Sequence, residues 1–250
     1  MKRYQVWLDG KSLNDIDPAV RVIDIREHAP ASRLEALPRA MGDGMHVTRH
    51  SRDALGVTVS FVIREYQPAL RKTIMQKIRA WSQGHVLQIS DRPGQRLTVK
   101  ADQLPSLGSA LKWTDTCSVT FTARDMPYWE EAFPSEAAAS SLTVPGDAPF
   151  CPLDLRWTCR HSGAVTLVIE TPLSRIVFIE LQVSPGQELV ISHPQGIFTA
   201  ALNSQDILPC RTPASSDDLL VPCGCESTVS VYVDDQAAQG VILSARGRWL

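Results

Sequence analysis

Residues 57–84 read VTVSFVIREYQPALRKTIMQKIRAWSQG and place a strand pattern directly before a helix pattern. In 57–63, large apolar residues occupy every second position, as in a strand with one buried face. From Pro68 onward apolar residues recur at helical spacing, and Gly84 is suited to the position just after a helix. We therefore expect a strand followed by a helix over about residues 68–83. The apolar stripe of that helix comprises Leu70, Ile74, Ile78 and Trp81, with Arg71, Lys72, Lys77 and Arg79 on the other side.

The neighbouring patterns place this helix in a sheet-rich domain. Residues 117–123 alternate apolar and polar side chains, and shorter strand patterns occupy 20–25, 86–89 and 97–99, with a Pro-Gly turn between the last two. One amphipathic helix needs one apolar surface to cover, and these strands supply it. The pattern predicts an α+β domain made mostly of antiparallel sheet, with the helix packed on it.

The charge distribution separates this domain from a second one. Residues 1–134 carry 19 Lys and Arg against 15 Asp and Glu, whereas residues 135–250 carry 6 against 12 and no lysine. Where the balance changes, residues 135–147 are small and polar and end in Pro-Gly-Asp, which is typical of a linker. We expect an N-terminal domain over 1–134, a linker over 135–147 and a C-terminal domain over 148–250.

The second domain has the pattern of an all-β fold. Its strand patterns are separated by turn residues at roughly the 8–12-residue spacing of a β-sandwich, without a helical period of useful length. The chain as a whole is therefore expected to be mainly β. The strand patterns cover 153–159, 165–171, 175–183, 188–192, 197–202, 228–233 and 241–245.

Composition excludes two broad functional classes. Of 250 residues 44% are apolar and 21% charged, and the net charge of −2 argues against a generally basic nucleic-acid-binding protein. No window approaches 18 uninterrupted apolar residues, so no membrane insertion is expected. Residues 1–10 lack the long apolar core of a secretory signal. We expect a protein made in a cytosol-like compartment that stays there or leaves by another route.

A search for catalytic motifs finds no nucleophile elbow, phosphate-binding loop or dinucleotide fingerprint. Glu130 and Glu131 lie among aromatic residues, which is a weak hint of glycoside hydrolysis. Adjacent strand residues point to opposite faces, however, so the two carboxylates would not flank one bond. His46 and His50 are four apart but lack the glutamate of a zinc-protease motif. We expect no enzymatic activity and assign no catalytic residue.

Metal and cofactor sites are equally unsupported. Asp15 and Asp17 are not followed by a calcium-binding loop pattern. Cys210, Cys223 and Cys225 are a conceivable zinc set, but no second pair has the spacing of a zinc ribbon or finger. Free thiols are the simpler interpretation. We therefore assign no metal-binding and no cofactor-binding residue.

Carbohydrate binding through the β-sandwich is the alternative function. Sandwich domains often bind sugars through an exposed tryptophan, and Trp157 is the candidate. Its place beside Leu155 in a predicted strand favours a core position instead. The clustered His, Asn and Arg of galectin sites are missing from this domain, so the alternative rests on fold class alone.

Four stretches in order resemble the distal tail proteins of long non-contractile-tailed phages. They are Leu8-Asp9-Gly10-Lys11-Ser12-Leu13, Leu87-Gln88-Ile89-Ser90-Asp91-Arg92-Pro93-Gly94, Cys117 to Glu130 with its Met126-Pro127-Tyr128-Trp129 end, and the terminal Ala245-Arg246-Gly247-Arg248-Trp249-Leu250. Each is weakly specific alone, whereas their order and spacing cover essentially the whole chain.

The resemblance implies a structural virion protein of the tail tip, assembled in the cytoplasm of a bacterial host. In that family the N-terminal domain forms a hexameric ring and the C-terminal galectin-like β-sandwich projects outward. The implied partners are other copies of the chain, the tail tube protein, and a tail-associated lysin or receptor-binding baseplate protein. No long insertion interrupts the sandwich, which puts direct host-glycan binding by this subunit in doubt.

Elementary chemistry is compatible with such an assembly. Unpaired sheet edges can be satisfied by pairing between subunits. Positive charge in the N-terminal domain would match acidic neighbouring rings, with Arg49, Arg52 and Lys112 as candidates; keeping the surface soluble is an equally good explanation. The aromatic segment 124–133 is the candidate for joining the two domains, and Trp129, if it is buried, should contribute about a few kcal/mol to that junction.

Overall fold

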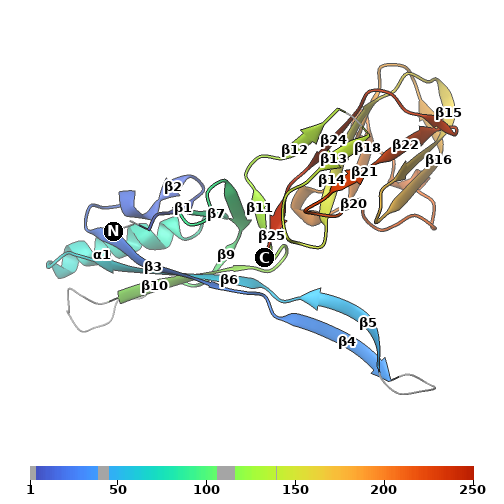
Figure 1. Ribbon diagram of the computed structural model, residues 1–250. Helices are drawn as coiled ribbons and strands as arrows, with labels where there is room; N and C mark the ends of the chain where they lie inside the picture. Colours follow the sequence, from blue (N-terminus) through green and yellow to red (C-terminus); the bar gives the residue numbers. More distant parts are fainter. Residues whose placement is uncertain (1–3, 39–44, 106–115, 139) are drawn as a thin grey trace. The chain divides into compact units, whose positions relative to one another are not determined.

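The computed structural model describes residues 4–38, 45–105, 116–138 and 140–250. The chain is mainly β and divides into two compact units, of which the first is Met1–Trp129 together with Leu250 and the second is Glu130–Trp249. Among the described residues there is one α-helix (Figure 1). No helix in that part of the chain is both long enough and apolar enough to cross a membrane.

The predicted strand at the centre of the first unit is confirmed. It is β6 (Leu55–Ile63), and its residues alternate between buried and half-buried along the whole strand. It pairs antiparallel with β3 (Val20–His28) on one side and β10 (Thr116–Ala123) on the other, and β10 also pairs with β9 (Lys100–Gln103). The sheet order is therefore β3-β6-β10-β9, with the period-2 face of β6 facing the core.

The helix α1 spans Pro68–Trp81 and packs on this sheet. The Trp81 ring meets the Phe121 ring of β10 edge-on at 5.9 Å. The buried residues of α1 are Arg71, Ile74, Met75, Ile78 and Trp81.

The predicted faces of α1 were wrong at two neighbouring residues, Leu70 and Arg71. Leu70 is 46% exposed, whereas Arg71, expected on the opposite side, is 5% exposed. At 3.6 residues per turn the buried face is centred between Arg71 and Ile78, which leaves Leu70 at its margin. The long apolar stem of Arg71 covers core surface in its place.

Four strands of the first unit follow one another in a second sheet in the order β2-β1-β7-β8. They are β1 (Val6–Leu8), β2 (Lys11–Ser12), β7 (Val86–Ile89) and β8 (Gln95–Thr98), and the short helix η1 (Leu13–Asp15) follows β2. The Asp9 carboxylate accepts the backbone N–H groups of His85 and Val86. Gly84 is needed beside it, because a Cβ there would lie 2.6 Å from an Asp9 carboxylate oxygen.

A two-stranded ribbon continues the β3–β6 pair (Figure 1). It consists of β4 (Ser32–Pro38) and β5 (Met45–Arg52), which pair antiparallel. The backbone N–H of Asp53 donates to the Ala31 carbonyl, which joins the two pairs into one long hairpin. This strand pair was not predicted from the sequence.

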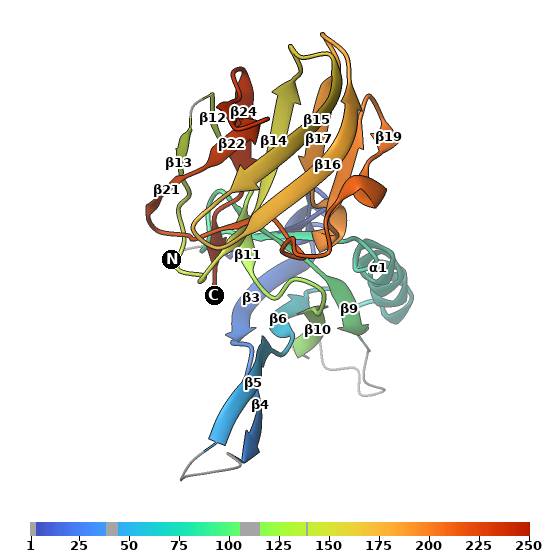
Figure 2. The same ribbon diagram turned by 90° about the vertical axis from the view of Figure 1, so that its right-hand side faces the viewer.

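The second unit contains two larger sheets around one core, as expected for a sandwich (Figure 2). One has the order β12-β24-β14-β17-β18-β19, with β20 also paired to β14, and the other has the order β16-β15-β22-β23. All seven predicted strand regions contain strands. The strands are β14 (Cys151–Thr158), β15 (Gly163–Glu170), β16 (Arg175–Val183), β17 (Glu188–Ser192), β18 (Thr199–Leu202), β19 (Gln205–Asp206), β20 (Leu220–Val221), β22 (Ser230–Val233), β23 (Gln236–Ala237) and β24 (Val241–Ala245), with the short helices η2 (Pro194–Gly196) and η3 (Leu208–Cys210).

The segment expected to be a linker contains strands of the second unit. Within residues 135–147, β12 (Ser135–Ala137) pairs with β24, and β13 (Ser141–Thr143) pairs with β21 (Glu226–Thr228). Ladder hydrogen bonds use backbone groups, so small polar residues can form edge strands without an apolar pattern. The chain passes from one unit to the other earlier, within β11 (Trp129–Glu131), and ends beyond β25 (Arg248–Trp249).

Candidate assembly surfaces

The outer edge of β3, a strand of nine residues, is one candidate for pairing with another chain. Among the described residues β3 has one ladder partner, β6. Near the start of β3, the backbone N–H of Val22 donates a hydrogen bond to Oδ1 of Asn14. Ile23 lies at a bulge in the register and is 42% exposed. Beyond it, Asp24 and Arg26 form an exposed ion pair of 2.7 Å. Charges of this kind discourage unspecific pairing of an edge, so a partner strand here must complement them.

The opposite edge of the same sheet is β9, which pairs with β10 alone in the described part of the chain. Asp102 on this strand accepts hydrogen bonds from the Thr122 hydroxyl and from the Arg124 guanidinium. The Thr122 hydrogen bond, then the Arg124 hydrogen bond, lower the pKa of the Asp102 carboxyl below its ordinary value of 3.8. Leu104, just after the strand, is 47% exposed. This edge therefore presents an exposed ion pair, Asp102 with Arg124, beside an apolar side chain.

The three cations suggested for contacts with neighbouring rings are not brought together by any described contact. Lys112 and the side chain of Arg49 lie outside the described residues. Arg52 is the last residue of β5 and is half-buried. His46 and His50 also belong to β5, with side chains outside the description. Charge matching with neighbouring rings stays a prediction.

Trp129 lies at the end of the first unit and has the largest fully buried side chain among the described residues of that unit. Its side chain is 0% exposed, and its indole N–H donates to Glu27 Oε2 at 2.9 Å. The Arg92 guanidinium lies 5.3 Å from the centre of the indole ring and also donates to Glu27 Oε1 at 3.0 Å. Arg92 further donates to the backbone oxygen of Leu250. Trp129 therefore meets the condition of burial on which its expected contribution depended, whereas its partners Glu27 and Arg92 were not identified in the sequence.

Glu130, the first residue of the second unit, forms a buried ion pair with Arg248. The Arg248 guanidinium donates to Glu130 Oε1 from Nε at 3.0 Å and from Nη2 at 2.9 Å. Their side chains are 5% and 12% exposed, respectively. Glu131 accepts the Gly247 backbone N–H, and its own carbonyl accepts a hydrogen bond from Arg246. The two carboxylates thus hold the C-terminal strand of their own unit, which is a structural role.

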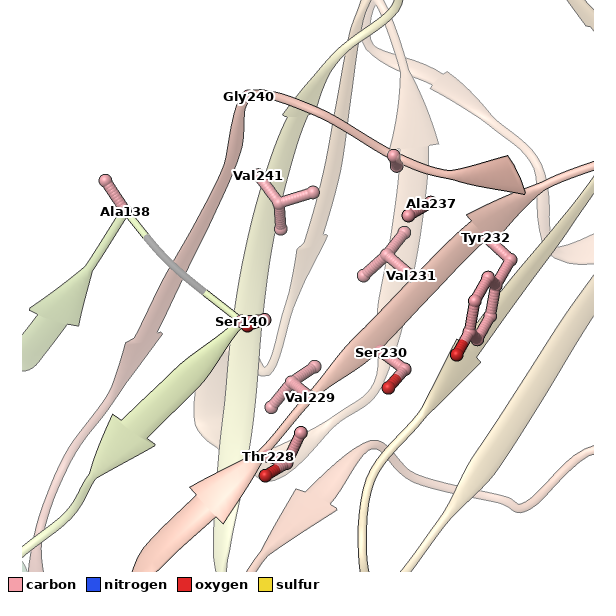
Figure 3. A pocket seen from close by; sticks show the side chains of 11 residues that line it. Ala138, Ser140, Thr228, Val229, Ser230, Val231, Tyr232, Ala237, Gly240 and Val241 are labelled. Atoms are coloured by element: carbon pink, nitrogen blue, oxygen red, sulfur yellow. The ribbon is translucent and has the colours of Figure 1, made fainter. Parts of the chain in front are cut away.

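A pocket of about 270 Å³ opens in the second unit (Figure 3). Its lining is small and uncharged, with one aromatic ring; it comprises Ala138, Ser140, Thr228, Val229, Ser230, Val231, Tyr232, Ala237, Ala238, Gly240 and Val241. Trp157, the candidate sugar platform, is 1% exposed and belongs to the core. The core interpretation of Trp157 is therefore confirmed, and the pocket is lined by other residues.

The residues considered for metal binding are dispersed. Within the described ranges, no group of three or more His, Cys, Asp or Glu side chains is arranged to hold a metal ion. Cys210 ends η3, Cys225 is exposed, and Cys223 lies beside Cys151. The proximity of Cys151 and Cys223 had no signal in the sequence.

Comparison with family models gives no match, and no curated protein sequence is significantly similar. The fold, in contrast, resembles solved structures. The crystal structure of the Dit protein of phage SPP1, described as a paradigm of the hub adsorption apparatus of phages that infect Gram-positive bacteria, matches over 100% of both chains with a TM-score of 0.70 and 13% identity. The likeness to distal tail proteins that the sequence motifs indicated is confirmed at the level of the fold.

Two structures of the phage p2 baseplate in its activated conformation, one with Sr and one with Ca, are more distant. Each match covers 98% of this chain and 97% of the other at 8% identity, with TM-scores of 0.46 and 0.47.

Proposed function

We propose that this chain is a structural component of a phage tail tip, where six copies form a ring that acts as a hub. The observation that carries the proposal is the fold shared with SPP1 Dit over the full length of both chains. Fold alone does not imply function, so the chain's own surfaces have to supply a means of assembly.

The first unit offers such a means. Its central sheet has two edges, at β3 and β9, that are unpaired within the described chain, and a ring closes when one edge of each copy meets the other edge of the next. The exposed Ile23 on one edge and Leu104 beside the other provide apolar contacts within charged surroundings. In this arrangement binding energy, rather than catalysis, is the function.

The partners follow from this role. A hub joins the tail tube on one face to a tail-associated lysin or a receptor-binding baseplate protein on the other. The chain would be assembled in the cytoplasm of the bacterial host and become part of the virion. Obligate interfaces commonly bury more than about 2,000 Å², and we assign most of that area to the first unit.

The test is the mass of the full-length protein in solution, measured by light scattering over a concentration series. Six chains of 27.5 kDa would give about 165 kDa (six times 27.5), and a doubled ring twice that mass. A monomer at every concentration would contradict a ring that closes by itself. Binding to a glycan array would then decide for the alternative function, adhesion through the sandwich.

Two matched variants locate the interface. Ile23→Lys places a charge on the β3 edge, where the isoleucine is 42% exposed, and should shift the mass toward the monomer. Ile179→Lys alters an isoleucine of the second unit that is 47% exposed, and should leave the mass unchanged. The reverse result would place the ring contacts on the second unit.

A further inference from the structure

Cys151 and Cys223 are neighbours in the second unit although they are distant in the sequence. Cys151 is the fully buried first residue of β14 and pairs across the ladder with Val221 of β20. Two residues later the chain turns at Cys223, which is half-buried against the same core. The two side chains are within hydrogen-bonding reach of each other, and both are free thiols.

The surroundings distinguish the two sulfurs. The hydrogen bond from Cys151, followed by one from the backbone N–H of Arg248 and the charge of its guanidinium, lowers the pKa of Cys223 against the opposing effect of burial. The shared hydrogen bond, and then burial, raise the pKa of Cys151. Because the thiolate is the nucleophile in disulfide exchange, Cys223 is suited to react first and Cys151 to resolve the product.

We propose that Cys151 and Cys223 form a reversible dithiol–disulfide site that low-molecular-weight disulfides oxidise. The Cys223 thiolate attacks one sulfur of the small disulfide, and the displaced thiolate takes up the proton that Cys223 gave up. Cys151 then loses its proton as its sulfur attacks the Cys223 sulfur, and the second small thiol leaves carrying a proton. Two protein thiols become one disulfide while one small disulfide becomes two thiols, so electrons and protons balance.

The cross-link would tie the start of β14 to the turn between β20 and β21. It would close a long loop, and long loops lose the most freedom in the unfolded chain when they are cross-linked. Reducing cytosol would keep the site open, and an oxidising exterior would close it. The site goes beyond the proposed hub role and does not depend on it.

The experiment uses the full-length protein, first reduced and then incubated with glutathione disulfide. Peptide mass mapping without reductant should find a cross-linked peptide pair containing Cys151 and Cys223, and the intact mass should fall by about 2 Da. The Tm should rise by about 5 °C or more and return after treatment with dithiothreitol. Cys225→Ser should keep both effects, since Cys225 is exposed and outside the pair.

Cys223→Ser should lose both effects. Three results would overturn the proposal: a glutathione adduct on Cys223 without the cross-link, a disulfide from Cys223 to Cys225 or Cys210, or a protein that keeps all its thiols. The mapping of the unmodified sequence needs no variant, so it decides the matter even where a substitution hinders folding.

Discussion

Replacing Trp129 by Ala removes the most buried contact at the end of the first unit. Truncating a fully buried tryptophan costs about 3–5 kcal/mol through lost apolar burial and the cavity left behind. The substitution also removes the indole N–H donated to Glu27 and the ring under the Arg92 guanidinium. Glu27 keeps its ion pair with Arg92, so its carboxylate retains a charged partner in the variant. We expect a total loss near 4 kcal/mol in the free energy of unfolding.

Urea denaturation followed by far-UV circular dichroism measures this loss, with each unit fitted as its own transition because two-unit chains need not unfold in one step. Phe133→Ala is the matched control: it is an aromatic residue of the same segment, 84% exposed, and should change stability by less than about 0.5 kcal/mol. Trp129→Phe retains most of the apolar surface and should lose about 1–2 kcal/mol with the hydrogen bond. A Trp129→Ala protein within about 1 kcal/mol of the parent would refute the anchoring role.

Three further predictions concern other contacts. Arg248→Met leaves the buried Glu130 carboxylate without its partner and should cost about 3–5 kcal/mol in urea denaturation, whereas a change below about 1 kcal/mol would show the pair to be dispensable. The pKa of Asp102, followed by NMR, should lie below 3.8 and return toward that value in Thr122→Val. Because folding lowers this pKa, the stability that the Asp102 carboxylate confers is present above pH 3.8 and is lost as the pH falls through the folded-state pKa. Gly146→Ala should lower the Tm markedly, since φ is +131° and a Cβ would lie 2.1 Å from the Arg248 carbonyl oxygen; an unchanged Tm would contradict this geometry.

Local periodicity was sufficient for the central elements of the fold. Alternation in 57–63 predicted which face of β6 is buried, because the strand period holds whatever the strand packs against. Helical spacing, with Pro68 at the start, placed α1 within two residues of its observed end at Trp81. The β4–β5 ribbon could not be predicted in this way, because residues 32–52 lack the sustained alternation of apolar and polar side chains that marks a strand with one buried face. Residues 135–147 were interpreted as a linker because they are small and polar, and the edge strands β12 and β13 that they form have no apolar alternation to reveal them.

Sequence alone thus determined that the chain is mainly β, with one helix on an antiparallel sheet and an all-β second half. Tertiary structure alone decided which side chains meet: Trp129 with Glu27, 102 positions away, Glu130 with Arg248, and Cys151 with Cys223. The physical reason is the range of the interactions. Propensity and period act between residues a few positions apart, whereas these contacts depend on how strands from distant parts of the chain are ordered in a sheet, which no local pattern specifies.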